Sequence, residues 1–147
     1  MNVIMCSGAL CYSLKTSRFL LLQKGYGKHY GTWGVVGGKL QPHESPIDGL
    51  KREVYEETNF SLADNKIIPL ETFISSNKVF HFYTYMCIVN DEFIPILSDE
   101  HIGWAWATLH NFPTPMHPGL KQSLNSTVVR TKIETVITLL NRFCLRE

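Results

Sequence analysis

Stretches of alternating or continuous apolar residues along the chain predict a set of β-strands. Four long stretches are separated by polar residues and cover residues 3–13, 18–24, 67–76 and 79–90. The last of them is largely apolar on both faces, so we expect a central strand that is covered from both sides. Shorter apolar stretches predict further strands over residues 33–36 and 103–109. The short connections within the first and second pairs of long stretches favour hairpins.

Two other segments carry the spacing of amphipathic helices. The first covers residues 46–58: it follows a capping serine, Ser45, and ends before Asn59, which suits a left-handed C-cap. The second covers residues 126–145, where apolar residues recur at helical spacing, and predicts a terminal helix packed on the sheet. Residues 120–124 predict only a helical turn. The order of strands and helices predicts an α/β protein with a mixed sheet covered by helices.

The helix expected over residues 46–58 has an apolar stripe with an acidic face beside it. The stripe is formed by Ile47, Leu50 and Val54. Glu53 and Glu57 lie one turn apart next to the stripe, and Glu56 lies further toward the polar side. Like charges at this spacing destabilise a helix, and acids in its last turn oppose its dipole. A bound divalent cation would reverse both penalties, although a solvated acidic face would show the same residues.

The acidic helix and the loop before it fit a longer pattern, G-x5-E-x7-R-E-U-x-E-E-x-G-U, where U is a bulky aliphatic or aromatic residue. Eight of its nine specified positions match. The matching residues are Gly38, Glu44, Arg52, Glu53, Val54, Glu56, Glu57 and Phe60. Asn59 replaces the final glycine, at a position whose role lies in the backbone and which Asn can fill. By this pattern the chain resembles the Nudix hydrolase family, of the MutT type.

The resemblance implies a fold, a reaction and a cofactor. The fold would be a Nudix-type α/β/α sandwich over residues 1–147, a single domain with a mixed central sheet, a catalytic loop-helix and a C-terminal helix. The reaction would be hydrolysis of a pyrophosphate bond in a nucleoside diphosphate linked to another group. Mg²⁺ would be the cofactor, with Mn²⁺ able to substitute, since the ligands are all oxygen. The alternative is a catalytically silent nucleotide sensor, but the acids that such a protein would lose are present.

The resemblance also assigns the metal ligands. Glu53 and Glu57 would bind the metal directly, together with the backbone carbonyl of Gly38, where a glycine-led loop brings bare backbone close to the ion. Glu56 would either bind a second ion or help to position the attacking water.

Further roles follow for residues around these ligands. Arg52 would hold a carboxylate in place, with Glu44 as its partner across the loop. The general base would come from the helix or from the loop before the strand at 103–109, where Glu100 is the first candidate and Asp99 the second. Arg52, Glu56 and Glu100 are thus the expected catalytic group.

Substrate-binding residues are harder to read from the sequence. Lys24 follows a predicted strand and could meet a phosphate, although a surface lysine would look the same. His117 lies in a Pro- and Gly-containing segment that could form a rim of the site. Three aromatic residues before the motif could stack on a base: Tyr26, Tyr30 and Trp33. No residue selects among a damaged nucleoside triphosphate, a nucleotide sugar, ADP-ribose and a dinucleotide.

Composition narrows the partners. The 147 residues carry a formal net charge of +1, so no strong field or basic stripe favours nucleic acid or a membrane surface. The N-terminus lacks the basic region of a secretory signal. The cysteines show no metal or disulfide spacing, which indicates reduced, buried thiols in a cytoplasmic protein: Cys6, Cys11, Cys87 and Cys144. His81 has no partner at ligand spacing and is expected to be a packed or pocket-edge histidine rather than a metal ligand. A homodimer is plausible for long strands, but no pattern indicates one.

Overall fold

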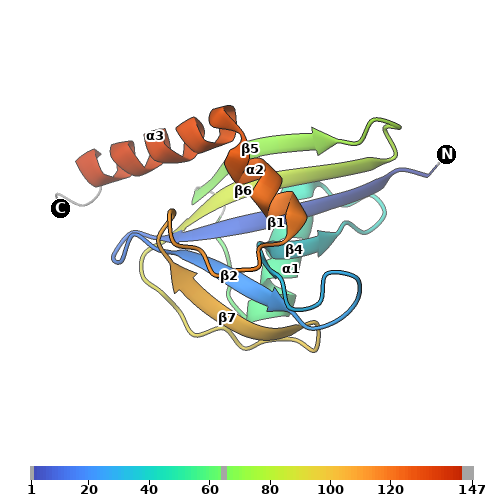
Figure 1. The fold of residues 1–147 in the computed structure, drawn as a ribbon, viewed down its shortest axis with the longest axis horizontal. Coiled ribbons are helices and arrows are strands. Elements are labelled where there is room, and N and C mark those ends of the chain that lie inside the picture. The colour runs from blue at the N-terminus through green and yellow to red at the C-terminus, as the bar shows by residue number, and fades with distance from the viewer. Residues whose placement is uncertain (1, 64–65, 144–147) are drawn as a thin grey trace.

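Seven strands form one mixed sheet in the computed structural model of the protein, which describes residues 2–63 and 66–143 (Figure 1). The strands are β1 (Ile4–Ser13), β2 (Phe19–Lys24), β3 (Trp33–Gly34), β4 (Val36–Lys39), β5 (Ile67–Ile74), β6 (Phe80–Val89) and β7 (His101–Ala107). The main path runs β3-β2-β1-β6-β5, with β4 paired to β1 and β7 paired to β2. β1 and β6 are parallel, whereas the other pairs are antiparallel, so the predicted mixed sheet is confirmed.

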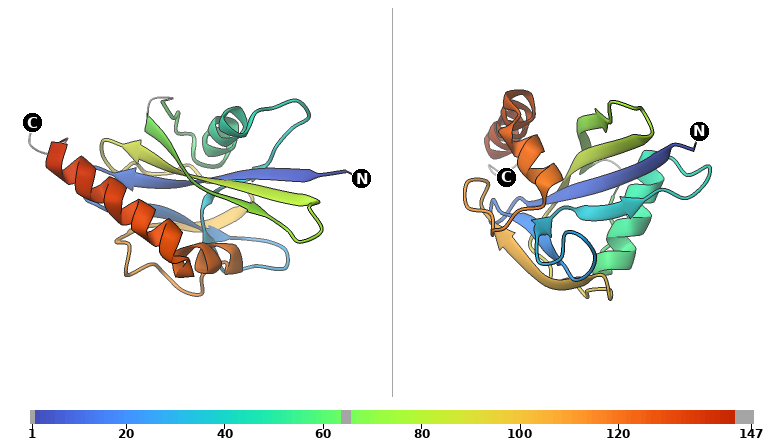
Figure 2. Two further views of the ribbon diagram at one scale, coloured as in Figure 1. Left: turned by 90° about the horizontal axis from the view of Figure 1, so that it is seen from above. Right: turned by 45° about the vertical axis from the view of Figure 1, so that its right-hand side comes forward.

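Helices cover both faces of the sheet. They are α1 (Pro46–Thr58), α2 (Pro118–Asn125) and α3 (Thr127–Phe143). α1 lies on one face, and α2 and α3 lie on the other (Figure 2). This is the predicted α/β/α arrangement. The helical turn expected at residues 120–124 is in fact a longer helix, because Pro118 begins it and the side chain of His117 caps it.

The two faces of the sheet enclose separate apolar clusters. On the first face, Leu50 and Val54 of α1 pack against residues that include Tyr85 and Cys87 of β6. On the second face, residues of α2 and α3 pack against a set that includes Met86 of β6. β6 therefore supplies side chains to both clusters, which confirms that it is a central strand covered on both sides.

The ends of α1 lie where the sequence predicts them. The Ser45 hydroxyl accepts a hydrogen bond of 3.1 Å from the backbone N–H of Asp48. Asn59 adopts the left-handed conformation, with φ of 64°. The predicted apolar stripe is wrong at Ile47, which is 38% exposed. The reason is that the first turn of α1 continues an exposed loop and only the later turns reach the sheet.

The predicted glycine-led loop is partly a strand. Gly37 and Gly38 belong to β4, where they pair with Gly8 and Ser7 of β1. A Cβ atom on Gly37 would lie 2.1 Å from the backbone oxygen of Ser7, so no larger residue fits there. The two glycines mark a close approach of two strands, which sequence alone does not distinguish from a loop.

The remaining predictions need small corrections. β7 begins at His101, two residues before the expected start, because it pairs with β2 as far as Lys24. Cys11 and Cys87 are buried free thiols, whereas Cys6 is only partly buried. Cys144 lies outside the described residues. Within residues 2–63 and 66–143, no helix is long and apolar enough to cross a membrane.

Candidate active site

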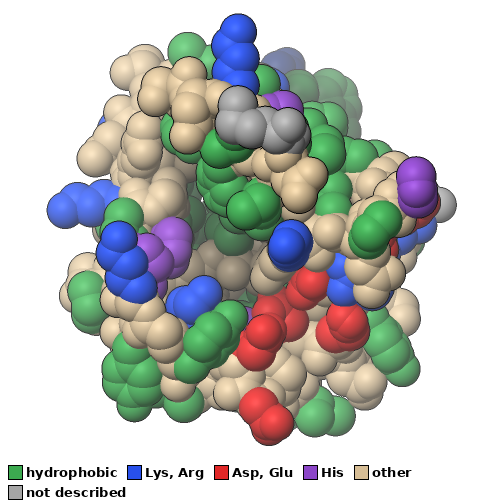
Figure 3. Space-filling model, turned by 90° about the vertical axis from the view of Figure 1, so that its right-hand side faces the viewer, with side chains coloured by type: hydrophobic (Ala, Val, Ile, Leu, Met, Phe, Trp, Pro, Cys, Tyr) green, Lys and Arg blue, Asp and Glu red, His purple; other side chains and the backbone are tan. Residues whose placement is uncertain are grey.

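A cavity of about 870 Å³ joins the acidic residues of α1 to an apolar region between the sheet and α2. Figure 3 shows a hollow in this side of the molecule, with Asp and Glu side chains on one border and Lys and His side chains on another. The predicted site residues that line the cavity are Lys24, Gly38, Glu53, Glu56, Glu57, Glu100 and His117, together with the lesser candidates Tyr26 and Asp99. The fold therefore brings together residues from five separate parts of the chain.

We call the part of the cavity around Glu53, Glu56, Glu57 and Glu100 its acidic end. Arg52 lies outside the cavity and holds carboxylates of this end in place. Its Nε and Nη2 atoms donate to both oxygens of Glu44, at 2.8 and 2.9 Å. Its Nη1 atom donates to Glu53 at 3.0 Å and to Glu56 at 2.7 Å. The hydrogen bonds to Glu44 raise the pKa of Arg52, and the same contacts lower the pKa of Glu44. The expected pairing of Arg52 with Glu44 is present, and one guanidinium group sets the positions of two cavity acids.

Glu57 is the most buried acid of the site, with 2% of its surface exposed. One of its oxygens accepts a hydrogen bond of 2.9 Å from the backbone N–H of Gly37. Burial raises the pKa of Glu57 to about 9, and the negative charge of Glu53 and a hydrogen bond with Glu100 add to the rise. Helical periodicity places Glu57 next to the apolar stripe, and contacts with Glu100 and His101 at the start of β7 add to its burial.

Gly38 makes room for Glu53. A Cβ atom at Gly38 would lie 2.7 Å from the carboxyl carbon of Glu53, so only glycine lets this carboxylate lie against β4. Burial raises the pKa of Glu53, and the hydrogen bond from Arg52 opposes that rise. Gly38 is thus needed to leave space for the Glu53 carboxylate at the acidic end.

His101 belongs to the site although the sequence did not single it out as a site residue. Its Nδ1 atom lies 3.7 Å from a Glu57 oxygen, too far for a hydrogen bond, and has no hydrogen-bond partner among the described residues. Burial lowers the pKa of His101, which favours the neutral ring. Its position next to Glu100 in the chain was the one available signal.

Lys24 and His117 line the cavity, and Lys24 gives its border a positive charge. The ammonium group of Lys24 is 4.9 Å from the centre of the Tyr26 ring. The ring of His117 packs 4.5 Å from that of His29, and its Nδ1 atom accepts the N–H of Gly119 at 3.0 Å. Burial and then the charge of His29 lower the pKa of His117.

Two of the three aromatic candidates for base stacking do not line the cavity. Tyr30 is 64% exposed, and Trp33 packs against the apolar cluster on the face of α2 and α3. His81 is partly buried, and its Nε2 atom contacts the backbone oxygen of Lys78 at 3.1 Å.

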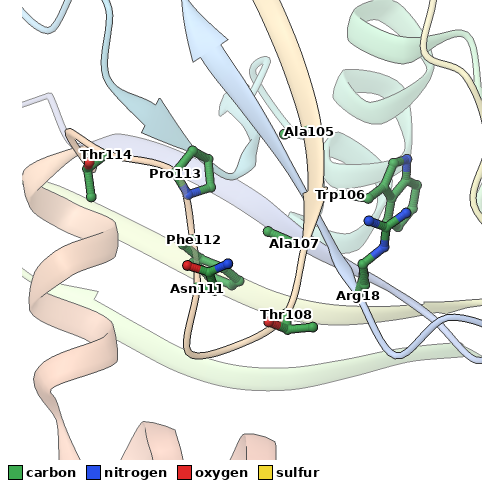
Figure 4. A pocket seen from close by; sticks show the side chains of 9 residues that line it. All are labelled: Arg18, Ala105, Trp106, Ala107, Thr108, Asn111, Phe112, Pro113 and Thr114. Carbon is green, nitrogen blue, oxygen red and sulfur yellow. The ribbon is translucent and has the colours of Figure 1, made fainter.

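A second cavity, of about 550 Å³, lies beside β7 and the loop that follows it. Figure 4 shows Arg18 and Trp106 on one side of β7 and residues 111–113 of the loop on the other. None of the described residues that line this cavity is a carboxylate, and Arg18 is bound to Glu92 at 2.6 Å. It lacks the groups that the predicted chemistry needs.

The carboxylates of the acidic end suit a hard divalent cation, since they offer oxygen donors. Among the residues that the structure describes, no three His, Cys, Asp or Glu side chains already form a complete ligand set. Arg52 occupies oxygens of Glu53 and Glu56, and Glu57 turns toward Gly37. Burial and then the negative charge of Glu53 raise the pKa of Glu57 to about 9, and a nearby cation would favour the charged carboxylate instead. The residues therefore fit a divalent metal ion in chemistry.

Comparison with known proteins shows the family to which this chain belongs. Residues 6–126 match the model of the NUDIX domain family. A protein named dihydroneopterin triphosphate diphosphatase from Haemophilus influenzae is 27% identical over 66% of this chain and 69% of its own length. A nucleoside triphosphate pyrophosphatase/Nudix hydrolase fusion protein from Bifidobacterium longum is 47% identical over 59% of this chain, but over only 13% of its own length. The crystal structure of a MutT protein from Methanosarcina mazei matches with a TM-score of 0.68 and 27% identity, over 91% of this chain and 96% of that one.

The family model covers most of the chain, so this protein belongs to the Nudix hydrolase family. The predictions of a Nudix fold and of a pyrophosphohydrolase are thereby confirmed.

Proposed function

We propose that this protein hydrolyses a pyrophosphate bond in a small nucleotide-like triphosphate or diphosphate with the aid of a divalent metal ion. The observation that carries the proposal is the meeting of Glu53, Glu56, Glu57 and Glu100 at one end of a cavity whose other end is apolar. Such a cavity can place a phosphate chain against the acids and a ring system against the apolar surface. The name of the Haemophilus influenzae relative supports a triphosphate carried by a fused ring.

Glu53, Glu57 and the backbone carbonyl of Gly38 are the proposed metal ligands, with Glu56 for a second ion or a water. When bound, Mg²⁺ or Mn²⁺ would neutralise phosphate oxygens and lower the pKa of a bound water. Arg52 is a positioning residue, since it holds Glu53 and Glu56 together.

The other residues of the cavity have roles in proton transfer and substrate binding. Glu100 is the proposed general base, because its carboxylate lies beside Glu57 at the water-facing border of the cavity and can accept a proton from water. Lys24 and His117 border the same cavity and are proposed to meet the phosphate chain, where an ammonium group binds as a point charge. Asp99 remains the second candidate for the base.

We also propose that the protein acts in the cytoplasm on a small molecule. The free thiols of Cys11 and Cys87 and the net charge of +1 support this.

The experiment is a phosphate and pyrophosphate release assay on a panel of triphosphates, nucleotide sugars, ADP-ribose and dinucleotides, with and without Mg²⁺. Glu57→Gln is expected to lower turnover by about three orders of magnitude, since it removes a charge that acts in the transition state. Asp48→Asn on the same helix is the matched control, because Asp48 is exposed and outside the cavity. Retained turnover in the Glu57 variant would reject the metal assignment. Saturable nucleotide binding without turnover in the wild type would favour the sensor.

A further inference from the structure

The apolar end of the large cavity contains a single carboxylate among the described residues, that of Glu71 on β5. Its neighbours in the lining are Phe73, Phe80 and Phe82 of the sheet and Leu120 and Leu124 of α2. The ring centres of Phe80 and Phe82 are 6.2 Å apart, and those of Phe73 and Phe80 are 6.3 Å apart. A charged group in such surroundings is costly unless a partner satisfies it.

An irregularity of β5 turns Glu71 into the cavity. Pro69 pairs with Tyr85, but the next paired residue is Glu71, which lies opposite Thr84, so Leu70 is an extra residue. Thr84 lines the cavity. Without the extra residue, Glu71 would lie opposite Tyr83, whose side chain packs on the face of α1. Bulges of this kind re-aim a side chain next to a functional site.

A hydrogen bond then fixes the carboxylate. The hydroxyl of Ser123 on α2 donates to the Oε1 atom of Glu71 at 2.6 Å. No Lys or Arg in the described part of the chain forms an ion pair with Glu71. A carboxylate accepts about four hydrogen bonds, so both oxygens keep free acceptor positions after the Ser123 contact. Glu71 is therefore oriented and left with acceptor capacity beside the apolar side chains that line this end of the cavity.

We propose that Glu71 determines substrate specificity by accepting two hydrogen bonds from a ring N–H and the adjacent exocyclic amino group of the substrate. Guanine and pterins carry this pair of donors side by side, in the spacing of the two carboxylate oxygens. Adenine and cytosine place a ring acceptor beside their amino group, and uracil places carbonyl oxygens beside its ring N–H, so each would face Glu71 with a repelling lone pair. The aromatic side chains, Phe82 foremost, would pack against the same ring.

The inference rests on the proposed function, because it assigns the triphosphate or diphosphate to the acidic end of the same cavity. A site built around a hydrogen-bonding partner rejects an analogue that lacks the donor more strongly than an apolar pocket does. Inosine differs from guanosine in lacking the exocyclic amino group. A comparison of the two therefore measures the hydrogen bond between that group and Glu71.

The test compares kcat/KM for GTP, ITP, ATP and dihydroneopterin triphosphate in the presence of Mg²⁺. The wild type is expected to prefer GTP and the pterin compound over ITP and ATP by about 10- to 100-fold. Glu71→Gln is expected to remove most of that preference, mainly through KM, because its amide NH₂ would face the ring N–H. Glu134→Gln on the exposed surface of α3 is the matched control and should keep the preference.

The two proposals can fail separately. Equal kcat/KM for GTP and ITP, or an equal loss for both in the Glu71 variant, would overturn the specificity role while leaving hydrolysis intact. If no compound is hydrolysed, the proposed function fails, and the relative affinities for GDP, IDP and ADP in an equilibrium binding assay still decide on Glu71. Stronger binding of GDP that is lost in the Glu71 variant would support the role, and equal binding would reject it.

Discussion

The two ends of the large cavity are built in different ways. At the acidic end, Glu53, Glu56 and Glu57 come from one helix, and the strand that faces them comes shortly before it in the sequence, whereas only Glu100 is added from the distant loop before β7. At the apolar end, Phe82, Glu71 and Leu120 come from β6, β5 and α2, which are far apart along the chain. The chemistry of the acidic end depends mainly on local spacing along the chain. The selectivity of the apolar end depends on how distant elements pack, and one cavity combines the two.

The ends also differ in what they do for stability. The acidic end buries Glu57 among other acids, and the resulting pKa of about 9 marks an environment that disfavours the charged form. The apolar end continues into the cluster around Met86, Leu120 and Ile133, whose burial stabilises the fold. Variants at the two ends should therefore separate turnover from binding and from stability.

The largest expected effect on stability comes from β4, the strand that faces the acidic end. Gly37→Ala should lower the free energy of unfolding by about 3 kcal/mol or more, since its Cβ would overlap the backbone of β1 and backbone cannot give way. Urea unfolding followed by circular dichroism measures the change.

Gly38→Ala is the matched control for that variant. Its Cβ would meet the flexible end of Glu53, so stability should stay within about 1 kcal/mol of wild type while kcat falls about 10-fold or more. Equal loss of stability in both variants would contradict this distinction, because it would show that Gly38 is as tightly constrained as Gly37.

An intermediate effect is expected at the apolar end. Phe82→Leu keeps an apolar side chain but removes the ring, so KM should rise about 5- to 10-fold with little change in kcat. Steady-state kinetics on the best substrate of the panel measures this, with Phe143→Leu at the exposed end of α3 as control. A fall in kcat at unchanged KM would place Phe82 with the acidic end instead.

The smallest effect is expected at a carboxylate outside the cavity, whose pKa moves in the opposite direction to that of Glu57. Arg18 donates two hydrogen bonds to Glu92, at 2.6 and 2.7 Å, and lowers its pKa, while burial and then the neighbouring charge of Asp91, itself paired with Lys15, oppose the shift. The stabilisation is then present above the ordinary pKa of Glu92 and is lost as the pH falls through its lowered value.

Glu92→Gln should therefore reduce Tm slightly at pH 7, and the difference from wild type should shrink as the pH falls toward 3. Thermal unfolding at several pH values measures both. A difference that grows in acid would contradict the lowered pKa. The Arg18 side chain is 43% exposed, so solvent screens the ion pair and the change is expected to be minor.

Local signals were sufficient for α1 and its acids. Ser45 and Asn59 mark its ends by capping chemistry, and the helical repeat places Glu53 and Glu57 on the same side. The partnership of Arg52 with Glu44 was expected from the family pattern and is present. Trp33 and Tyr30 show the limit of such reasoning, because an aromatic residue near a motif can equally pack in the core or lie in solvent.

Features that depend on the pairing of distant strands could not be predicted from the sequence. The role of Gly37 as a contact between β4 and β1, the burial of Glu57 beneath the loop at Glu100, and the position of His101 all require the assembled sheet. Glu71 is the clearest case, since one extra residue in β5 decides which face it occupies.

The sequence by itself determined the family, the central helix and the chemical nature of the acids, because capping, helical periodicity and motif spacing act over a few residues. Only the tertiary structure decided how deeply those acids are buried and which side chains stand opposite them. The physical reason is that burial and strand register arise from contacts between segments that are far apart in the chain, and no local pattern encodes them.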